Sequence, residues 1–343
     1  MNEAITYKCP GCGAAMVFNP DTQELSCPYC FTTYKVDDYL KESAESSNDD
    51  EPTQDMKIYH CTSCGAELVS DEFTSATICG FCGNPTLVSD RLKGKFTPSL
   101  IIPFKLDKAA ASQAFVNWAK KGILTPGDFH SDSTIEKLSG IYVPFWFYDV
   151  HSTNYMHGTG LRVRTEDHSD HYYTVTDYYD VVRSIEADFI RVPADASAKM
   201  ADGDMDKLEP FDYSELRKFE MPYLSGYLSE RYNYTADDMK NRIYNRTDKY
   251  ITESTTECLA GYSSISGRTD SPQSQVVKDE YALLPVWMLN YHYKDKDYTF
   301  LMNGQTGRIV ATRPISNART AAAFVISFII VLIIAMIGGV ILW

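Results

Sequence analysis

The sequence predicts an α+β protein rich in antiparallel strands, with two small cysteine modules before this domain and one apolar helix after it. Three observations support this prediction. Cysteine pairs recur at constant spacing near the N-terminus, strand-like runs surround helical stretches in the middle, and residues 321–343 contain no charge. Strands and helices that are segregated along a chain are typical of the α+β class.

The C-terminal apolar run has the length of a membrane span. Only Ser327 interrupts its apolar character between residues 321 and 343. As a helix, 23 residues rise about 34 Å, close to the roughly 30 Å hydrocarbon core of a bilayer. A helix buried in a soluble core usually keeps a polar stripe, which is missing here. We therefore expect one transmembrane helix, with the anchor at residues 319–343.

Charge around this helix predicts its orientation. Arg308, Arg313 and Arg319 precede it, and no acidic residue follows Asp297. Positive charge is retained on the cytoplasmic side of membranes. The N-terminus also lacks the basic and apolar regions of a secretory signal. We expect a single-pass protein of the cell membrane whose N-terminal bulk is cytoplasmic.

The overall charge disfavours nucleic acid as a partner. The formal net charge is −14, and residues 1–90 contain 4 Lys and no Arg against 15 acidic residues. Such a chain repels polyanions. The 24 Tyr, 16 Phe and 4 Trp could stack on bases, but stacking platforms combine aromatic side chains with a basic groove. These aromatic residues more naturally fill β-sheet faces and a protein interface.

Two cysteine sets have the spacing of zinc ribbons. The first set is Cys9, Cys12, Cys27 and Cys30, and the second is Cys61, Cys64, Cys79 and Cys82. Each set contains two C-x-x-C pairs separated by fourteen residues, which form a hairpin that brings the pairs together around one ion. Gly13 follows the first pair and eases its tight turn, whereas Phe31 stands at the equivalent position after the second.

These sets predict two structural zinc ions per chain. Modules of about 35 residues bury too little apolar surface to fold alone, so the metal should supply their folding free energy. An iron site of the rubredoxin type and a thioredoxin-like redox pair are the alternatives. We place the ribbons at residues 1–40 and 57–90, separated by an acidic flexible linker at 41–56. The linker predicts that each ribbon unfolds independently of the main domain.

Residues 91–318 should form the α+β domain. Asp107 is the expected N-cap of a helix that presents Ala111, Phe115 and Trp118 on one face. Thr235 and Asp238 form a weak capping box before a second helix, with a stripe of Met239, Ile243 and Tyr250. The other expected elements are strands at 142–150, 172–182, 184–192 and 281–293, a helix at 213–232, and a hairpin at 298–312 around Asn303-Gly304. Cys258, near the end of the second helix, is expected to be a buried, inert thiol.

The chain resembles the bacterial, Firmicute TFIIB-type zinc ribbon-containing membrane proteins. The resemblance rests on the twin cysteine sets, on Ile-Ile-Pro-Phe-Lys at 101–105, on Gly-Ile-Tyr-Val-Pro-Phe-Trp at 140–146, on Tyr-Ala-Leu-Leu-Pro-Val-Trp at 281–287 and on Asn-Gly-Gln-Thr-Gly at 303–307. It implies protein partners at the inner membrane face, because similar members are encoded beside PspA-type and SPFH-type membrane-stress proteins. It supplies no catalytic residue.

A histidine-rich segment is the best candidate for a second metal or catalytic site. It contains His168, Asp170 and His171, to which His151 and His157 could contribute. A solvated loop between strands is the alternative interpretation. The sequence contains no G-x-S-x-G, H-E-x-x-H, P-loop or Rossmann glycine motif.

These features favour a non-enzymatic, membrane-anchored adaptor that recruits or organises proteins in envelope stress. Ala335 and Gly339 stand four residues apart, so another helix could approach closely and form an oligomer. The alternatives are a membrane-tethered nucleic-acid-binding protein and a metal-dependent hydrolase that uses the histidine segment.

Overall fold

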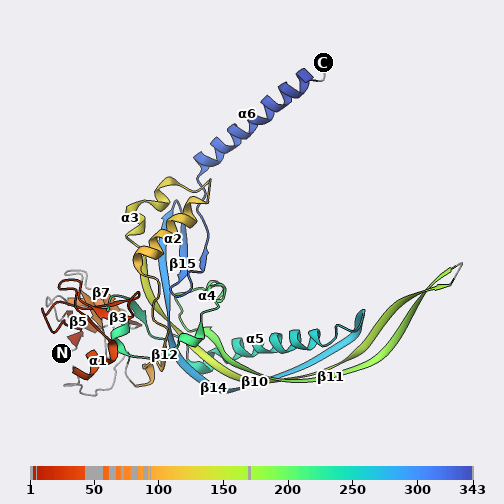
Figure 1. The fold of residues 1–343 in the computed structure, drawn as a ribbon, viewed down its shortest axis with the longest axis horizontal. Coiled ribbons are helices and arrows are strands. Elements are labelled where there is room, and N and C mark those ends of the chain that lie inside the picture. Colours follow the sequence, from red (N-terminus) through yellow and green to blue (C-terminus); the bar gives the residue numbers. More distant parts are fainter. Residues whose placement is uncertain are drawn as a thin grey trace. The chain divides into compact units, whose positions relative to one another are not determined.

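The protein has a mixed α+β fold with sheets dominated by antiparallel pairing (Figure 1). The computed structural model describes residues 3–4, 6–42, 57–61, 67–70, 73–78, 84–87, 92, 94–168 and 171–341. The chain divides into two compact units. Unit 1 comprises Met1–Val143, Lys199–Arg231 and Leu283–Trp343, and unit 2 comprises Pro144–Ala198 and Tyr232–Ala282.

The first cysteine module occupies residues 6–42 of unit 1. Its three-stranded antiparallel sheet consists of β2 (Val17–Asn19), β3 (Glu24–Ser26) and β4 (Thr33–Tyr34), followed by α1 (Val36–Glu42). Met16, Phe18 and Leu25 form its buried apolar centre. Of the linker predicted at 41–56, only the first two residues are described, and they end α1.

The second cysteine module, at residues 57–87, contains two antiparallel strand pairs. They are β5 (Lys57–Cys61) with β6 (Glu67–Ser70), and β7 (Thr74–Ile78) with β8 (Pro85–Leu87). The short β1 (Glu3–Ala4) pairs in parallel with β5, so the N-terminal segment links the two modules. β7 also pairs with β13 (Leu228–Glu230), which joins this module to the main sheet.

The main sheet of unit 1 has the order β12-β9-β14-β10-β13-β7-β8, with β15 and β16 continuing beyond β14. The remaining strands are β9 (Leu100–Ile101), β10 (Ser139–His168), β12 (Arg217–Lys218), β14 (Ser264–Tyr293), β15 (Lys296–Asn303) and β16 (Ile309–Ala311). The aromatic centre surrounds Phe104, whose ring stacks on Tyr227 at 4.2 Å and meets Tyr142 and Trp287 edge-on. The short turn after Asn303 confirms the predicted hairpin, because β15 and β16 pair antiparallel.

Helix α2 (Lys108–Lys120) covers this sheet, and the predicted cap is confirmed. Asp107 accepts a hydrogen bond from the N–H of Ala110 at 2.7 Å. Phe115 is buried against Phe300 of β15, with ring centroids 5.0 Å apart. Short helical segments complete unit 1: η2 (Gly94–Phe96), η3 (Gly127–His130), α3 (Asp132–Ile135), α4 (Asp202–Leu208), η4 (Tyr213–Glu215) and η5 (Met221–Leu224).

The predicted helix at 213–232 is wrong. The segment instead contains η4, β12, η5 and β13 in succession. Pro222 lacks the N–H that a helix interior needs, and Gly226 has a φ of 92°, which ends regular structure. The alternation of short elements lets β12 and β13 join the sheet at separate places.

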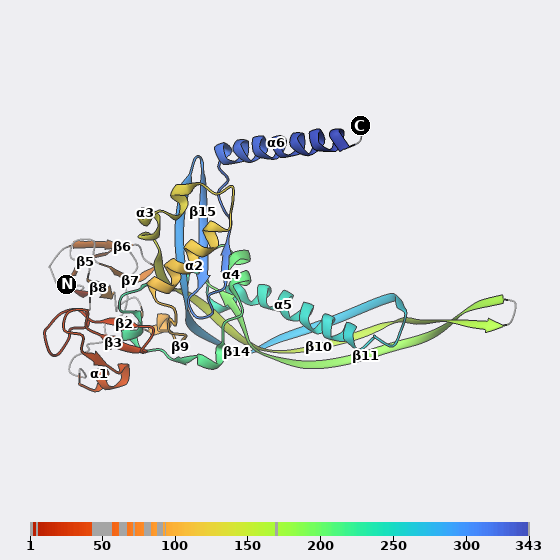
Figure 2. The same ribbon diagram turned by 45° about the horizontal axis from the view of Figure 1, so that its top comes forward.

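Unit 2 consists of long strands with one helix along them (Figure 2). β10 and β14 continue here from unit 1, and β11 (His171–Asp195) pairs antiparallel with β10 up to the partners His168 and His171. The two strands expected at 172–182 and 184–192 are therefore one strand. The pairing of this strand with β10 is interrupted near its end instead. There the register shifts between Tyr148 and Val150 of β10, and Arg191 of β11 has a φ of 56°.

Helix α5 (Ala236–Glu257) has the predicted capping box of Thr235 and Asp238. Its buried stripe is Met239, Ile243, Thr247, Ile251 and Thr255, and Tyr250 is only half-buried. The stripe advances four residues at a time, which leaves Cys258 outside it. Cys258 is exposed, so the expectation of a buried thiol is wrong.

The C-terminal helix α6 (Asn317–Ile341) contains a window, Asn317–Met336, that is long and apolar enough to cross a membrane. None of this window is buried in the protein. A core helix of a soluble protein would pack most of such a surface against other elements. The exposure of α6 is thus consistent with a membrane span.

Candidate metal centre

Four thiols of the first cysteine module converge on one point. The sulfur atoms of Cys9, Cys12, Cys27 and Cys30 all lie within 4.8 Å of one another. The Sγ atoms of Cys9 and Cys30 are 3.5 Å apart, as are those of Cys12 and Cys27. Thiolates around one tetrahedral ion with metal–sulfur bonds near 2.3 Å are about 3.8 Å apart. The cluster therefore has the dimensions of a four-thiolate metal site.

The two C-x-x-C turns have the same backbone geometry. In each, the residue after the second cysteine donates its N–H to the carbonyl of the first: Gly13 to Cys9 at 2.8 Å and Phe31 to Cys27 at 2.9 Å. Both residues have positive φ, 75° for Gly13 and 60° for Phe31. The position after each pair thus requires the left-handed conformation, which glycine adopts without strain.

The pKa values of the thiols are also consistent with metal binding, which requires the deprotonated thiolates. Hydrogen bonds from the hydroxyl and the N–H of Thr32 lower the pKa of Cys30 to about 6. A backbone hydrogen bond from Ala14 lowers the pKa of Cys12, but hydrogen bonds with Cys27 and Cys30 outweigh it and raise that pKa to about 12. One thiolate forms readily, whereas several together repel one another. A bound cation removes this repulsion and is the natural occupant of the cluster.

The second cysteine set is only partly described. Cys61 ends β5, and Cys64, Cys79 and Cys82 lie outside the described residues. The predicted hairpin within the fourteen-residue insert is present in the first set, where β2 pairs with β3, but in the second set the insert strands β6 and β7 belong to different sheets. The segment with Cys64 connects the antiparallel strands β5 and β6, and the segment with Cys79 and Cys82 connects β7 and β8.

The candidate histidines are distributed along one hairpin. His168 and His171 are cross-strand partners at its tip, while Asp170 and the side chain of His168 lie outside the described part of the chain. His157 lies eleven residues before His168 on β10, a separation of about 36 Å along a strand. Among the four candidate histidines, the described backbone therefore pairs only His168 with His171.

His151 and His157 instead contact carboxylates across the hairpin. Nδ1 of His151 lies 2.8 Å from Asp188, and Nε2 of His157 lies 2.8 Å from Asp180. The hydrogen bond to Asp188 raises the pKa of His151. Both histidines are thereby explained as cross-strand partners of carboxylates.

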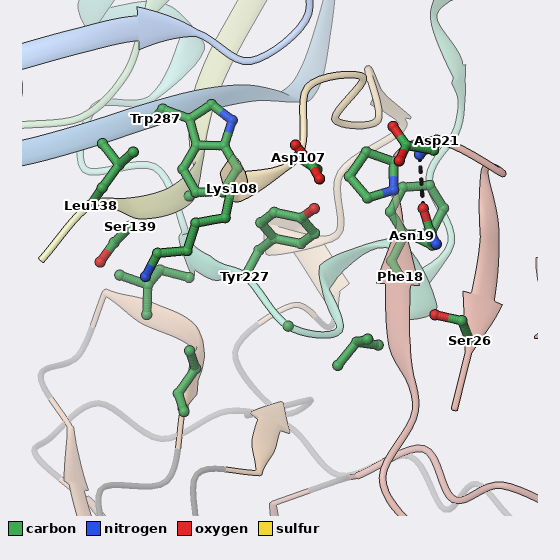
Figure 3. A pocket seen from close by; sticks show the side chains of 16 residues that line it. Phe18, Asn19, Asp21, Ser26, Asp107, Lys108, Leu138, Ser139, Tyr227 and Trp287 are labelled. Atoms are coloured by element: carbon green, nitrogen blue, oxygen red, sulfur yellow. Dashed lines mark hydrogen bonds between the residues drawn. The ribbon is translucent and has the colours of Figure 1, made fainter. Parts of the chain in front are cut away.

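A cavity of about 400 Å³ adjoins the first cysteine module (Figure 3). Phe18 and Asn19 line it from β2, Lys108 from α2, and Tyr227 and Trp287 from the main domain. Burial, with the charges of Asp107 and Asp21, raises the pKa of Tyr227 above its ordinary value. These residues come from segments far apart in the sequence, and of the five only Trp287 lies in a quoted motif, the one at 281–287.

Comparison with known proteins identifies a relative of nearly equal length. The chain is 40% identical over 321 residues to "Uncharacterized protein YdjG" of Bacillus subtilis (strain 168), and the alignment covers 93% of each protein. No protein-family model matches the chain, and no solved structure matches it.

Proposed function

The chain belongs to the same family as YdjG of Bacillus subtilis, and we propose that it is a membrane-anchored zinc-ribbon adaptor without catalytic activity of its own. One zinc ion binds Cys9, Cys12, Cys27 and Cys30, and a second binds Cys61, Cys64, Cys79 and Cys82. Helix α6 crosses the cell membrane once and leaves the remainder of the chain on the cytoplasmic side. The four convergent thiols and the exposed apolar helix support these assignments.

The observation that carries the adaptor role is an exposed two-stranded arm in unit 2. β14 begins at Ser264, just after Ser263, which donates its N–H to the carbonyl of Leu161, whereas the hairpin of β10 and β11 continues to His168 and His171. The arm, residues 162–168 and 171–180, thus extends past the third strand. An isolated two-stranded hairpin is only marginally stable in water, and a packed partner stabilises it.

The two faces of the arm differ in chemistry. Cross-strand partners share a face, and one face carries Val163 opposite Thr176, Thr165 opposite Thr174, and Tyr172 opposite Asp167. Tyr172 is 77% exposed, and Tyr178, farther along the same face, is 70% exposed. The other face contains Arg164, which pairs with Glu166 and Asp177. Tyr173 and Val175 share that face, so the faces differ mainly in charge: it carries Arg162, Arg164, Glu166 and Asp177, whereas the face with Tyr172 and Tyr178 carries Asp167 and Asp180.

Exposed tyrosines are typical of protein-binding surfaces. The proposed partner is a peripheral membrane-stress protein of the PspA or SPFH type. The resemblance of the sequence to families encoded beside such proteins supports this choice. Anchoring by α6 would concentrate the arm at the membrane, where these partners act.

Imaging of a fluorescent PspA-type protein in cells that also produce variants of this chain tests the proposal. Deletion of residues 317–343 should move the chain and its partner to the cytosol. Tyr172→Ser with Tyr178→Ser should leave the chain at the membrane but release the partner. The matched control is Thr165→Ser with Thr174→Ser, which alters the same face without removing an aromatic ring. Retention of the partner by the tyrosine variant would refute the arm as the capture surface.

A further inference from the structure

The segment that leads into α6 is fixed against the end of α2. Nε and Nη2 of Arg313 donate to the carbonyl oxygen of Trp118 at 3.1 and 2.8 Å, and the guanidinium lies 4.2 Å from the indole centroid. Ser316 then donates its N–H to the carbonyl of Leu124 at 2.9 Å. A Cβ on Gly122 would lie 2.1 Å from Oγ1 of Thr125 and 2.5 Å from Cδ of Arg313, so a side chain there would displace these two side chains.

Two isoleucines flank this attachment and are exposed. Ile123 precedes Leu124 and is 84% exposed, and Ile315 precedes Ser316 and is 57% exposed. Leu124 and Ser316 are joined by the hydrogen bond, Ile123 directly precedes Leu124, and Asn317, the first residue of α6, directly follows Ser316. The Cα atoms of Ile123 and Asn317 are therefore at most about 13 Å apart. Any bilayer that α6 crosses begins at this end of unit 1.

Lysines lie around the same place. Lys120 and Lys121 end α2 and are exposed. Lys294 and Lys296 are also exposed and lie at the turn between β14 and β15. This turn lies close to Leu124, because the hydroxyl of Tyr291 donates to Oδ2 of Asp128 at 3.0 Å and Asp128 is in η3, four residues after Leu124. The acidic groups of this turn are Asp295 and Asp297, and Asp297 pairs with His292 at 2.7 Å.

We propose that Lys120, Lys121, Ile123, Lys294, Lys296 and Ile315 form a lipid-contact patch that binds the surface of an anionic bilayer. Lysines near a membrane are attracted to anionic headgroups, and exposed isoleucines partition into the apolar boundary beneath them. The patch stands out because the chain as a whole carries a net charge of −14. This inference rests on the proposed role of α6 as a membrane span.

Bound in this way, the patch holds the adaptor at a defined distance from the bilayer. Arg313 and Ser316 restrict the segment before α6, so the span does not act as a free tether. Contact through the patch adds a second attachment to the helix. Unit 1 would then meet the membrane through the end of α2 and the β14–β15 turn.

The test uses the full chain in lipid nanodiscs, with a fluorescent amino acid in place of Ile123 and nitroxide-labelled lipids as quenchers. A probe at Thr22, an exposed residue in the turn between β2 and β3, is the control. We expect at least threefold stronger quenching at position 123 than at position 22 in discs that contain phosphatidylglycerol. Lys120→Glu with Lys121→Glu should reduce the quenching at 123 in these discs, but not in discs of phosphatidylcholine alone.

Charge reversal elsewhere, Arg217→Glu with Lys218→Glu in β12, should leave the quenching at 123 unchanged. Equal quenching at positions 123 and 22 would overturn the patch, and so would insensitivity to the Lys120 and Lys121 changes in anionic discs. Failure of the chain to enter nanodiscs, with release by alkaline carbonate, would instead refute the membrane span itself. The two failures are thereby distinguished.

Discussion

The hydroxyl of Ser225 donates a hydrogen bond to the carbonyl oxygen of Met16 at 2.6 Å, and both residues are buried. Ser225 also accepts a hydrogen bond at its own carbonyl from the N–H of Phe18 at 2.9 Å. These bonds join the first cysteine module to the main domain across 209 positions of sequence. The module is thus part of the packing of unit 1.

Cys12→Ser should therefore destabilise more than the module that contains it. Loss of metal unfolds β2, and buried groups such as the Ser225 hydroxyl then lose their partners, at about 1–3 kcal/mol each. The linker alone predicts that the module unfolds independently of the main domain. Because of these contacts, we instead expect part of the main domain to be destabilised with it. Hydrogen exchange should rise in residues 222–230, and Cys258→Ser, which changes an exposed thiol outside the cluster, is the control. Unchanged exchange in 222–230 would contradict the coupling.

Elemental analysis of anaerobically purified protein should find two zinc ions per chain. Each cysteine set provides four thiolates, which complete a tetrahedral site. Cys9→Ser should remove one ion and leave the other. Iron with a red colour would instead support the rubredoxin-type alternative, and a wild-type content of one ion would exclude the second site.

Local sequence signals predicted the caps and the cysteine turns because their hydrogen bonds connect near neighbours. Asp107 with Ala110 and Thr235 with Asp238 are three residues apart, and each Cys pair closes its own turn. The long strand β14 was predicted only in its apolar second half, since its first half has exposed polar side chains. Hydrogen bonds to distant residues stabilise this polar first half of β14. Nδ2 of Asn154 on β10, for example, donates to Thr255 of α5 and to Asp270 of β14. No local pattern reports contacts over such separations.

A buried ion pair should stabilise unit 2. Nη1 of Arg242 in α5 lies 2.9 Å from Oδ1 of Asp195 in β11, and the Asp195 side chain is fully buried. Arg242→Ala leaves a buried carboxylate without this cation and should lower the free energy of unfolding by about 3–5 kcal/mol. Lys249→Ala, which removes an exposed pair with Glu253 on the same helix, should change it by less than about 0.5 kcal/mol. Urea denaturation monitored by circular dichroism makes the comparison, and equal effects would be inconsistent with a buried pair.

The pair of His151 with Asp188 should make the hairpin sensitive to pH. The hydrogen bond to Asp188 raises the pKa of His151 in the folded state, so protonated His151 favours folding. This stabilisation is complete below the unfolded pKa of about 6.5 and disappears as pH rises through the higher folded value. NMR titration should show the raised pKa, and Asp188→Asn should return it toward the ordinary value. An unchanged titration in Asp188→Asn would rule out the pair as its cause.

Phe31 should be a suboptimal residue for its backbone position. Its φ of 60° is a conformation that costs an L-residue about 1–2 kcal/mol, and its side chain is 82% exposed, so little packing offsets that cost. Glycine loses more backbone entropy on folding than phenylalanine, which offsets part of this strain. We therefore expect Phe31→Gly to raise the stability of the module by about 0.5–1 kcal/mol. Gly13→Ala is the reciprocal change: a Cβ there would meet no atom within 4 Å, so any destabilisation reports backbone strain alone. Competition with a zinc chelator should show slower metal loss for Phe31→Gly and faster loss for Gly13→Ala. If Phe31→Gly instead weakens the module, the Phe31 ring must contribute packing that exceeds the strain.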